Sequence, residues 1–236
     1  MTATSHGDNA PDRAPLAREI PRIHQLCDDL VSALPVDGVA LTLRSGRDHS
    51  QLVYATDALT AALDELEFTI GEGPGLDCYR AGRPSLEPDL ASEATFARWP
   101  GFSSEARHLG AGALFAFPMH LGSGSIGNAT LYRSTSGPMD GAEIASATGC
   151  VDKIVHAVLE LLKPSGQLRA GLENSIVILG HPEVAQATGM IAVQLGVSIT
   201  EALARLRARA FVERSAISEI ACDVIARRRR FTNDPI

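Results

Sequence analysis

Arginines near the C-terminal end are the side chains whose type and spacing best suit the binding of a ligand, here an anionic one. The segment from Glu201 to Arg230 carries eight arginines against four acidic residues, whereas residues 1–200 carry 13 basic and 23 acidic residues. Guanidinium groups hydrogen-bond phosphates in a bidentate manner and stack on unpaired bases. The cluster therefore predicts contact with RNA or another polyanion. The alternative is that the run from Arg227 to Arg230 is a solvated helix end that complements the helix dipole.

The four cysteines are too far apart in the sequence for a zinc site or a compact disulfide framework. They are separated by 51, 72 and 72 residues, and we expect free thiols in a reducing cytoplasm. Cys78 shortly follows a glycine-rich loop, where a sensor could place a reactive thiol. A structural thiol is the competing interpretation, because Arg80 is the only basic neighbour that could lower its pKa.

The sequence lacks motifs for catalysis or metal binding. The seven histidines are scattered without an H-E-x-x-H pattern, and neither a G-x-S-x-G elbow nor a P-loop is found. The stretch Gly122–Gly127 matches G-x-G-x-x-G, but it lies between two predicted strands and indicates a hairpin turn. We therefore predict no catalytic residue, no metal site and no enzymatic activity.

Length and composition indicate two domains. The chain has 236 residues, of which 45% are hydrophobic, enough for one sizeable core and a small second one. The net charge of −7 argues against a general nucleic-acid coat. The polar start and the lack of an apolar run of roughly 20 residues predict a cytoplasmic protein that does not enter a membrane.

The N-terminal part has the pattern of an α+β domain over residues 16–163, preceded by a disordered tail at residues 1–15. Helical spacing opens and closes this domain, and two hairpins lie between. A glycine-rich loop and a loop-rich stretch at 82–110 complete it. The expected helices are 16–34, 58–66, 76–81 and 144–162, and the expected strands are 39–43, 52–54, 113–119 and 128–132.

After Pro164 the pattern becomes helical throughout. We predict a linker or connecting helix at 164–182 and an all-α three-helix bundle at 183–231, with helices at 184–195, 198–212 and 217–230. Gly196 is placed to end the first helix, and Ser198 with Glu201 forms a capping-box pattern for the second.

Three segments of the N-terminal part resemble a GAF domain, a sensor fold with a central antiparallel sheet and flanking helices. They are Ile70–Leu76, the strand Leu114–Met119 with the tryptophan-containing loop before it, and Ile126–Tyr132. The resemblance implies a domain that binds an unidentified small molecule or serves as a dimerisation scaffold. The candidate pocket residues are Cys78, Trp99, Phe115 and Phe117. An anchored surface loop is the alternative for Trp99.

The C-terminal part resembles an ANTAR domain through Ala187–Ile191, Ala202–Ala210 and Ile217–Ala221. Such domains bind paired RNA hairpins and prevent formation of a terminator. The resemblance and the arginine pattern together give the candidate RNA-binding residues Thr188, Gly189, Arg205, Arg207, Arg209, Arg214, Arg227 and Arg228. Many ANTAR domains carry a lysine where this chain has Thr188.

The two resemblances together are those of an actinobacterial-type GAF and ANTAR antitermination regulator. They imply a homodimer on structured RNA, with the apolar stripes of the helices at the two ends of the GAF-like domain as the interface. The helix 144–162 would couple the two domains. Two alternatives stay open: a GAF-based thiol redox enzyme using Cys78, and a DNA-binding regulator using the helical triplet.

Overall fold

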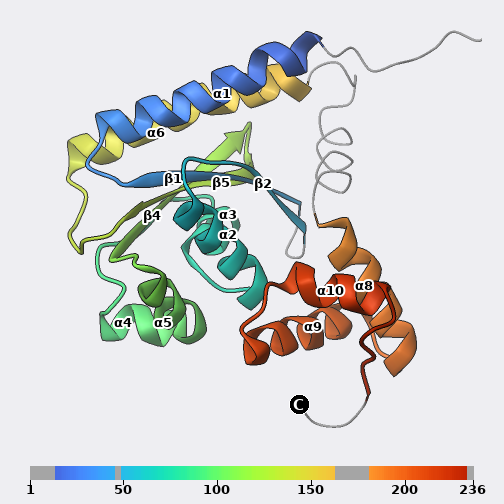
Figure 1. The fold of residues 1–236 in the computed structure, drawn as a ribbon. Helices are drawn as coiled ribbons and strands as arrows, with labels where there is room; N and C mark the ends of the chain where they lie inside the picture. The colour runs from blue at the N-terminus through green and yellow to red at the C-terminus, as the bar shows by residue number, and fades with distance from the viewer. Residues whose placement is uncertain (1–13, 46–48, 163–180, 233–236) are drawn as a thin grey trace, which may run out of the picture.

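The computed structural model describes residues 14–45, 49–162 and 181–232 (Figure 1). Within these ranges an N-terminal α+β domain is followed by a C-terminal bundle of helices, as the sequence predicts. The expected tail, apart from residues 14 and 15, and the expected linker, apart from residues 181 and 182, lie outside the described residues.

Five antiparallel strands form the central sheet, in the order β2-β1-β5-β4-β3. Gly127 permits the close pairing of β1 and β5, since a β-carbon there would lie 2.1 Å from the carbonyl oxygen of Thr42. Residues of β1 are buried almost throughout, because helices cover both faces of the sheet. The strands are β1 (Gly38–Ser45), β2 (His49–Ala55), β3 (Ser85–Glu87), β4 (Ala113–Leu121) and β5 (Gly124–Arg133).

Two long helices cover one face of the sheet, α1 (Ala14–Ala33) and α6 (Gly141–Leu162). They lie side by side in Figure 1, although more than a hundred residues separate them. The apolar stripes predicted from the sequence face the sheet and build the largest core, which includes Cys27, Phe115 and Ile154. These buried stripe residues are therefore not the dimer interface predicted from the sequence. Alternate residues of β4 point into this core.

The other face of the sheet is covered by shorter helices: α2 (Ala58–Ile70), α3 (Pro74–Ala81), α4 (Glu93–Arg98) and α5 (Pro100–Leu109). The prediction that residues 82–110 are rich in loops is therefore wrong. Ser92 caps α4 by accepting from the amide of Thr95, and Pro100 begins α5 at a position where its missing N–H costs nothing. Phe102 and Ala106, four residues apart, are the buried apolar residues that hold α5 to the domain.

The C-terminal bundle consists of α8 (Pro182–Leu195), α9 (Ile199–Glu213) and α10 (Ile217–Ile225). Gly196 ends α8 in the left-handed conformation and the Ser198 side chain accepts from the amide of Glu201, as predicted. The third helix is shorter than expected, because Arg227 is left-handed at φ 57°. The chain then turns back, and the amide of Phe231 donates to the side-chain oxygen of Gln194 at 3.0 Å.

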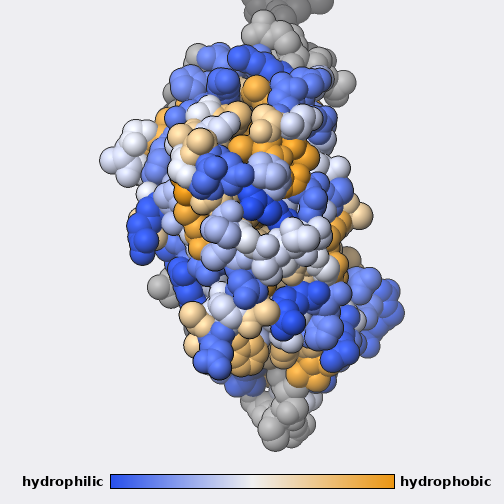
Figure 2. Space-filling model, turned by 90° about the vertical axis from the view of Figure 1, so that its left-hand side faces the viewer, coloured by the Kyte–Doolittle hydropathy of each residue, from blue (hydrophilic) through white to orange (hydrophobic). Residues whose placement is uncertain are grey.

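In the described ranges, no single helix has both the length and the apolar character of a membrane span. The pair α8 and α9 would pass such a test together, by length and composition only, but the two helices are bent by 107° at their junction. On the face shown in Figure 2, hydrophilic residues predominate and apolar residues form separate small patches.

Candidate functional site

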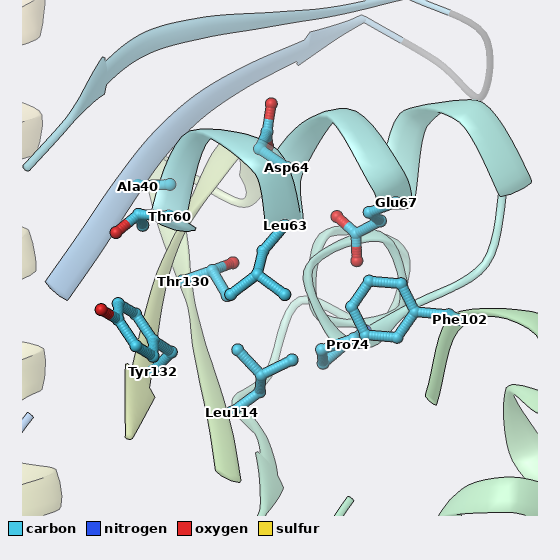
Figure 3. Close-up of a pocket in the computed structure, with 10 residues that line it drawn as sticks. All are labelled: Ala40, Thr60, Leu63, Asp64, Glu67, Pro74, Phe102, Leu114, Thr130 and Tyr132. Atoms are coloured by element: carbon cyan, nitrogen blue, oxygen red, sulfur yellow. The ribbon is translucent and has the colours of Figure 1, made fainter. Parts of the chain in front are cut away.

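The space between the sheet and α2 contains a small cavity (Figure 3). Ten residues surround it, and they come from the strands β1, β4 and β5 and from the helices α2, α3 and α5. Its volume is about 10 Å³, which is the minimum for one water molecule. The lining residues are Ala40, Thr60, Leu63, Asp64, Glu67, Pro74, Phe102, Leu114, Thr130 and Tyr132.

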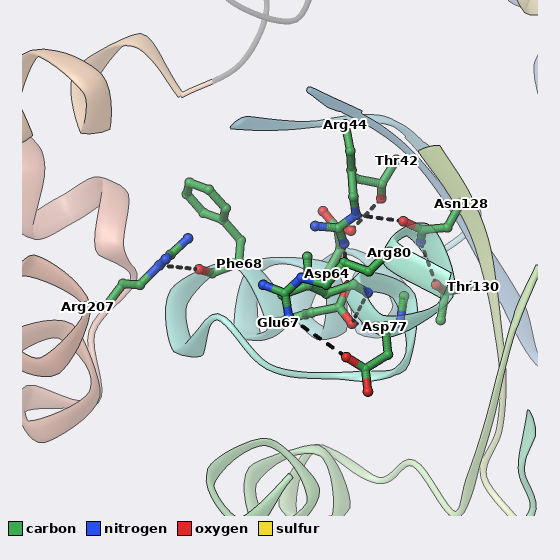
Figure 4. A network of polar contacts seen from close by, with 12 residues as sticks. Thr42, Arg44, Asp64, Glu67, Phe68, Asp77, Arg80, Asn128, Thr130 and Arg207 are labelled. Atoms are coloured by element: carbon green, nitrogen blue, oxygen red, sulfur yellow. Dashed lines mark hydrogen bonds and ion pairs between the residues drawn. The ribbon is translucent and has the colours of Figure 1, made fainter. Parts of the chain in front are cut away.

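A buried polar cluster beside this cavity joins β1, β5 and α2 (Figure 4). Arg44 forms an ion pair with Glu67, and both side chains are only 5% exposed. The Arg44 Nε donates to Asn128 Oδ1 at 2.7 Å, and Asn128 Nδ2 donates to Thr130 Oγ1 at 2.9 Å. Because each buried charge or amide has a partner, the cluster is a stable part of the domain interior.

Glu67 also caps the first turn of α3. Its Oε1 accepts from the amides of Gly75 at 2.7 Å and Leu76 at 3.1 Å. Burial raises the pKa of Glu67, while the Arg44 guanidinium and these amides act in the opposite direction. A β-carbon at Gly73 would lie 2.4 Å from Glu67 Oε1, and Gly73 has φ +150°. The glycine-rich loop is therefore shaped around the carboxylate of Glu67.

Asp64 is the second acidic side chain at this cavity. Its Oδ1 accepts a hydrogen bond from the Thr42 hydroxyl, and burial raises the pKa of Asp64 despite the nearby Arg44. Among the described residues, no group of three His, Cys, Asp or Glu side chains is arranged to hold a metal ion.

The four predicted pocket residues do not line this cavity. Phe115 and Phe117 lie in the core on the opposite face of the sheet. Trp99 is 2% exposed between α4 and α5, where its Nε1 donates to Asp77 at 3.2 Å, so it is an anchored core residue and not a surface-loop residue. Cys78 is fully buried, and burial, with a further contribution from Glu67, raises its thiol pKa to about 12.

Sequence reasoning missed Arg44, Glu67 and Asn128. Arg44 and Asn128 are polar residues inside strands that are otherwise apolar or small, and Glu67 lies in an otherwise apolar end of α2. Buried polar residues need partners, so polar types at core positions were the available signal. Their pairing was not readable, because 23 residues separate Arg44 from Glu67 and 84 separate it from Asn128.

The C-terminal arginines are brought together with several acidic residues. Arg205 pairs with Glu201 at 2.7 Å, Arg209 with Glu213 at 3.5 Å, and Arg228 with Asp223 at 2.7 Å. Arg229 shares Glu213 with Arg209. Arg214 and Arg227 are exposed, and both have left-handed backbones at turns that follow helices.

Arg207 differs from the other arginines because it faces the N-terminal domain. Its Nε donates to the carbonyl oxygen of Phe68 at 3.1 Å, and its guanidinium carbon lies 5.6 Å from the centre of the Phe68 ring (Figure 4). The Phe68 ring also stacks on His181, with centroids 4.5 Å apart. Phe68 belongs to α2 but is packed into the core of the C-terminal bundle. It therefore joins the two domains.

The two candidate residues on α8 have different surroundings. Thr188 is 3% exposed, and its hydroxyl donates to the carbonyl of Val184 at 2.6 Å within the same helix. At Gly189, an added β-carbon would meet nothing within 4 Å. Gly189 thus borders open space, whereas Thr188 and Ala187 face the bundle core.

Solved GAF domains are similar to this chain in fold. The GAF domain region of a protein from Geobacter sulfurreducens matches with a TM-score of 0.51 and 10% identity, over 61% of this chain and 95% of that one. A domain described as part of a two-component sensor histidine kinase from Sinorhizobium meliloti matches with a TM-score of 0.50 and 17% identity, over 62% and 94%. In comparisons of sequence, no protein-family model and no curated protein matches this chain. The N-terminal α+β domain has the GAF fold.

Proposed function

We propose that this protein is a non-enzymatic transcription antitermination regulator, in which the helical bundle binds structured RNA and the GAF-fold domain controls that binding. The observation that carries the proposal is the position of the arginines. All eight lie on α9, at the turn after it, or directly after α10, within one small bundle.

The acidic partners of these arginines can be displaced by the phosphate groups of RNA. Pairs between exposed side chains contribute little free energy, about 0–1 kcal/mol each. Phosphate groups, which accept bidentate hydrogen bonds from guanidinium, can therefore replace Glu201, Glu213 and Asp223 as partners at small cost. RNA binding then depends strongly on salt, because condensed counterions are released.

The contact between Arg207 and Phe68 gives the GAF-fold domain a means of control. Arg207 lies on the same helix as Arg205 and Arg209, but its side chain is held against α2. Contact of Arg207 with RNA requires α9 to leave α2. An equilibrium between docked and released bundles would thus set the number of arginines available to RNA.

A homodimer belongs to the same proposal, because two bundles can engage two paired hairpins. α1 and α6 form the outer layer of the GAF-fold domain, and Ile20 on α1 is 39% exposed. We expect light scattering to give twice the chain mass of 24.9 kDa. Ile20→Glu should shift the protein toward the single-chain mass, and a wild-type mass of one chain at all concentrations would contradict this part.

The experiment that tests RNA binding is a titration of a two-hairpin leader RNA in a salt series. The test variant changes Arg205, Arg207 and Arg209 to Ala. The control variant changes three exposed arginines of the GAF-fold domain, Arg22, Arg80 and Arg83, to Ala and so alters the net charge equally. We expect the test variant to lose most of its affinity and the control to keep it.

Two outcomes would overturn the proposal. Equal losses in both variants would indicate a general charge effect. A preference for duplex DNA over hairpin RNA would identify the bundle as a DNA-binding module instead.

A further inference from the structure

A large hollow lies between the two domains and not inside the GAF-fold domain. This interdomain cleft has a volume of about 510 Å³, against about 10 Å³ for the cavity beside the sheet. Clefts of about 300–1,000 Å³ are typical for small-molecule ligands. α2 and α5 form one wall, and the end of α9 with the turn before α10 forms the other.

The walls of the cleft carry several exposed apolar side chains. Seven large hydrophobic side chains are exposed in the described ranges, and three of them line this cleft: Leu109, Phe211 and Val212. Leu66 and Ile70 of α2 also line it. Exposed apolar surface gathered in one hollow indicates a binding site, because covering it with an apolar molecule is favourable.

The charged side chains that line the cleft determine which charge a bound ligand should carry. Glu105 is half-buried, and no described residue forms a hydrogen bond or ion pair with it. Glu65 adds a second carboxylate: its Oε2 lies 3.7 Å from His181 Nε2, and its Oε1 is buried without a hydrogen-bond partner in the described part of the chain. Arg214 is the one basic residue of the lining. The Glu105 carboxylate and the unsatisfied Oε1 of Glu65 favour a ligand with a cationic end that donates hydrogen bonds.

We propose that the interdomain cleft binds a small, mainly apolar organic cation, whose charged end pairs with Glu105. Such a molecule touches both domains and so stabilises the docked arrangement by mass action. Where the proposed RNA function holds, docking keeps Arg207 on Phe68, and the cation and RNA weaken each other's binding reciprocally.

Three indole compounds of nearly equal size and different charge test the site in the full chain by calorimetry. Tryptamine carries an ammonium group, tryptophol a hydroxyl group and indole-3-propionate a carboxylate. We expect tryptamine to bind about tenfold more tightly than tryptophol, a difference of about 1.4 kcal/mol, and indole-3-propionate to bind most weakly. Glu105→Gln should abolish the preference for tryptamine while tryptophol still binds. Glu93→Gln on α4, an exposed acidic residue outside the cleft, should leave the preference unchanged.

Lack of tryptamine binding at millimolar concentration would overturn the site. An unchanged preference for tryptamine in Glu105→Gln would overturn it as well. These outcomes do not involve RNA, so they are separate from a failure of the proposed function. In the RNA arm, saturating tryptamine should lower the affinity of the wild-type chain for the leader RNA several-fold. Cation binding with unaltered RNA affinity would contradict the coupling.

Discussion

Arg207 donates its Nε–H to the carbonyl oxygen of Phe68 across 139 positions of the sequence. That carbonyl belongs to the last turn of α2, where helix carbonyls lack partners within the helix and the dipole is negative. α2 has no basic residue in its own last turn. The C-terminal bundle thus supplies a cation at the negative end of this helix. Docking therefore stabilises both α2 and the bundle.

Phe68→Ala should release the bundle from the GAF-fold domain. The ring is 5% exposed and is shared by His181 and Arg207, so its loss removes apolar and aromatic contacts that join the two domains. We expect faster hydrogen exchange in α9 and a several-fold rise in affinity for the leader RNA. Phe96→Ala on α4, where the ring is 54% exposed, is the control and should change neither. A fall in RNA affinity in Phe68→Ala would show that docking supports RNA binding.

Arg44→Met should destabilise the GAF-fold domain strongly. It leaves Glu67 buried without its ion-pair partner, which costs about 3–5 kcal/mol of unfolding free energy. The double variant with Glu67→Gln should recover part of that loss, because the unpaired charge is removed. Arg228→Ala, which breaks the exposed pair with Asp223, should cost at most about 1 kcal/mol in the same denaturant titrations. Similar losses at both sites would refute the assigned role of the buried pair.

Gly189→Ala distinguishes the effect of this glycine on helix stability from its role in RNA contact. Because nothing lies within 4 Å of the added carbon, alanine should stabilise α8 by about 0.5–1 kcal/mol. If RNA approaches the helix backbone here, affinity for RNA should fall despite the gain in stability. Gly149→Ala on α6 also has open space and should give the gain without the loss of affinity. Unchanged RNA binding in Gly189→Ala would remove this residue from the contact surface.

The buried thiols should be unreactive in the folded protein. Burial raises the pKa values of Cys27 and Cys78 to about 12, so at pH 8 both are neutral as well as enclosed. Exposed Cys222 should react rapidly with Ellman's reagent, and all four thiols should react after unfolding. Rapid modification of native Cys78 would restore the redox-enzyme alternative.

The same shifts predict a pH dependence of stability. The folded chain holds these two protons more tightly than the unfolded chain, whose thiols titrate near about 8.5. The free energy of unfolding should therefore decline as pH rises from about 8.5 toward 12. Cys78→Ser should make the decline less steep.

Regular apolar spacing made most of the fold predictable. The apolar stripes of α1 and α6 and the apolar residues of β1 and β4 identified these helices and strands correctly. The stretch at 82–110 was misread because α4 and α5 are short and Pro100 lies between them. The end of α10 was placed too late because a run of arginines is compatible with a helix, whereas the backbone at Arg227 is left-handed.

The site was less predictable than the fold. Clustering of arginines is visible in the sequence, but their partners are set by tertiary packing, as the contact of Arg207 with Phe68 shows. The pocket candidates were chosen for type alone, and the sheet directs Phe115 and Phe117 to its other face. A cleft between domains has no local sequence pattern, because its two walls come from separate parts of the chain, residues 62–109 and residues 210–216.

The glycine-rich loop around Glu67 is an anion site whose anion belongs to the same chain. The loop presents two amides to a carboxylate that is covalently part of the chain, so the site is filled as soon as the domain folds and responds to no concentration outside it. Because Glu67 is covalently attached, the loop avoids the entropic cost of binding a free anion. Shortening that one side chain would leave the two amides and the buried guanidinium of Arg44 without this partner, so the loop and the carboxylate cannot be changed independently.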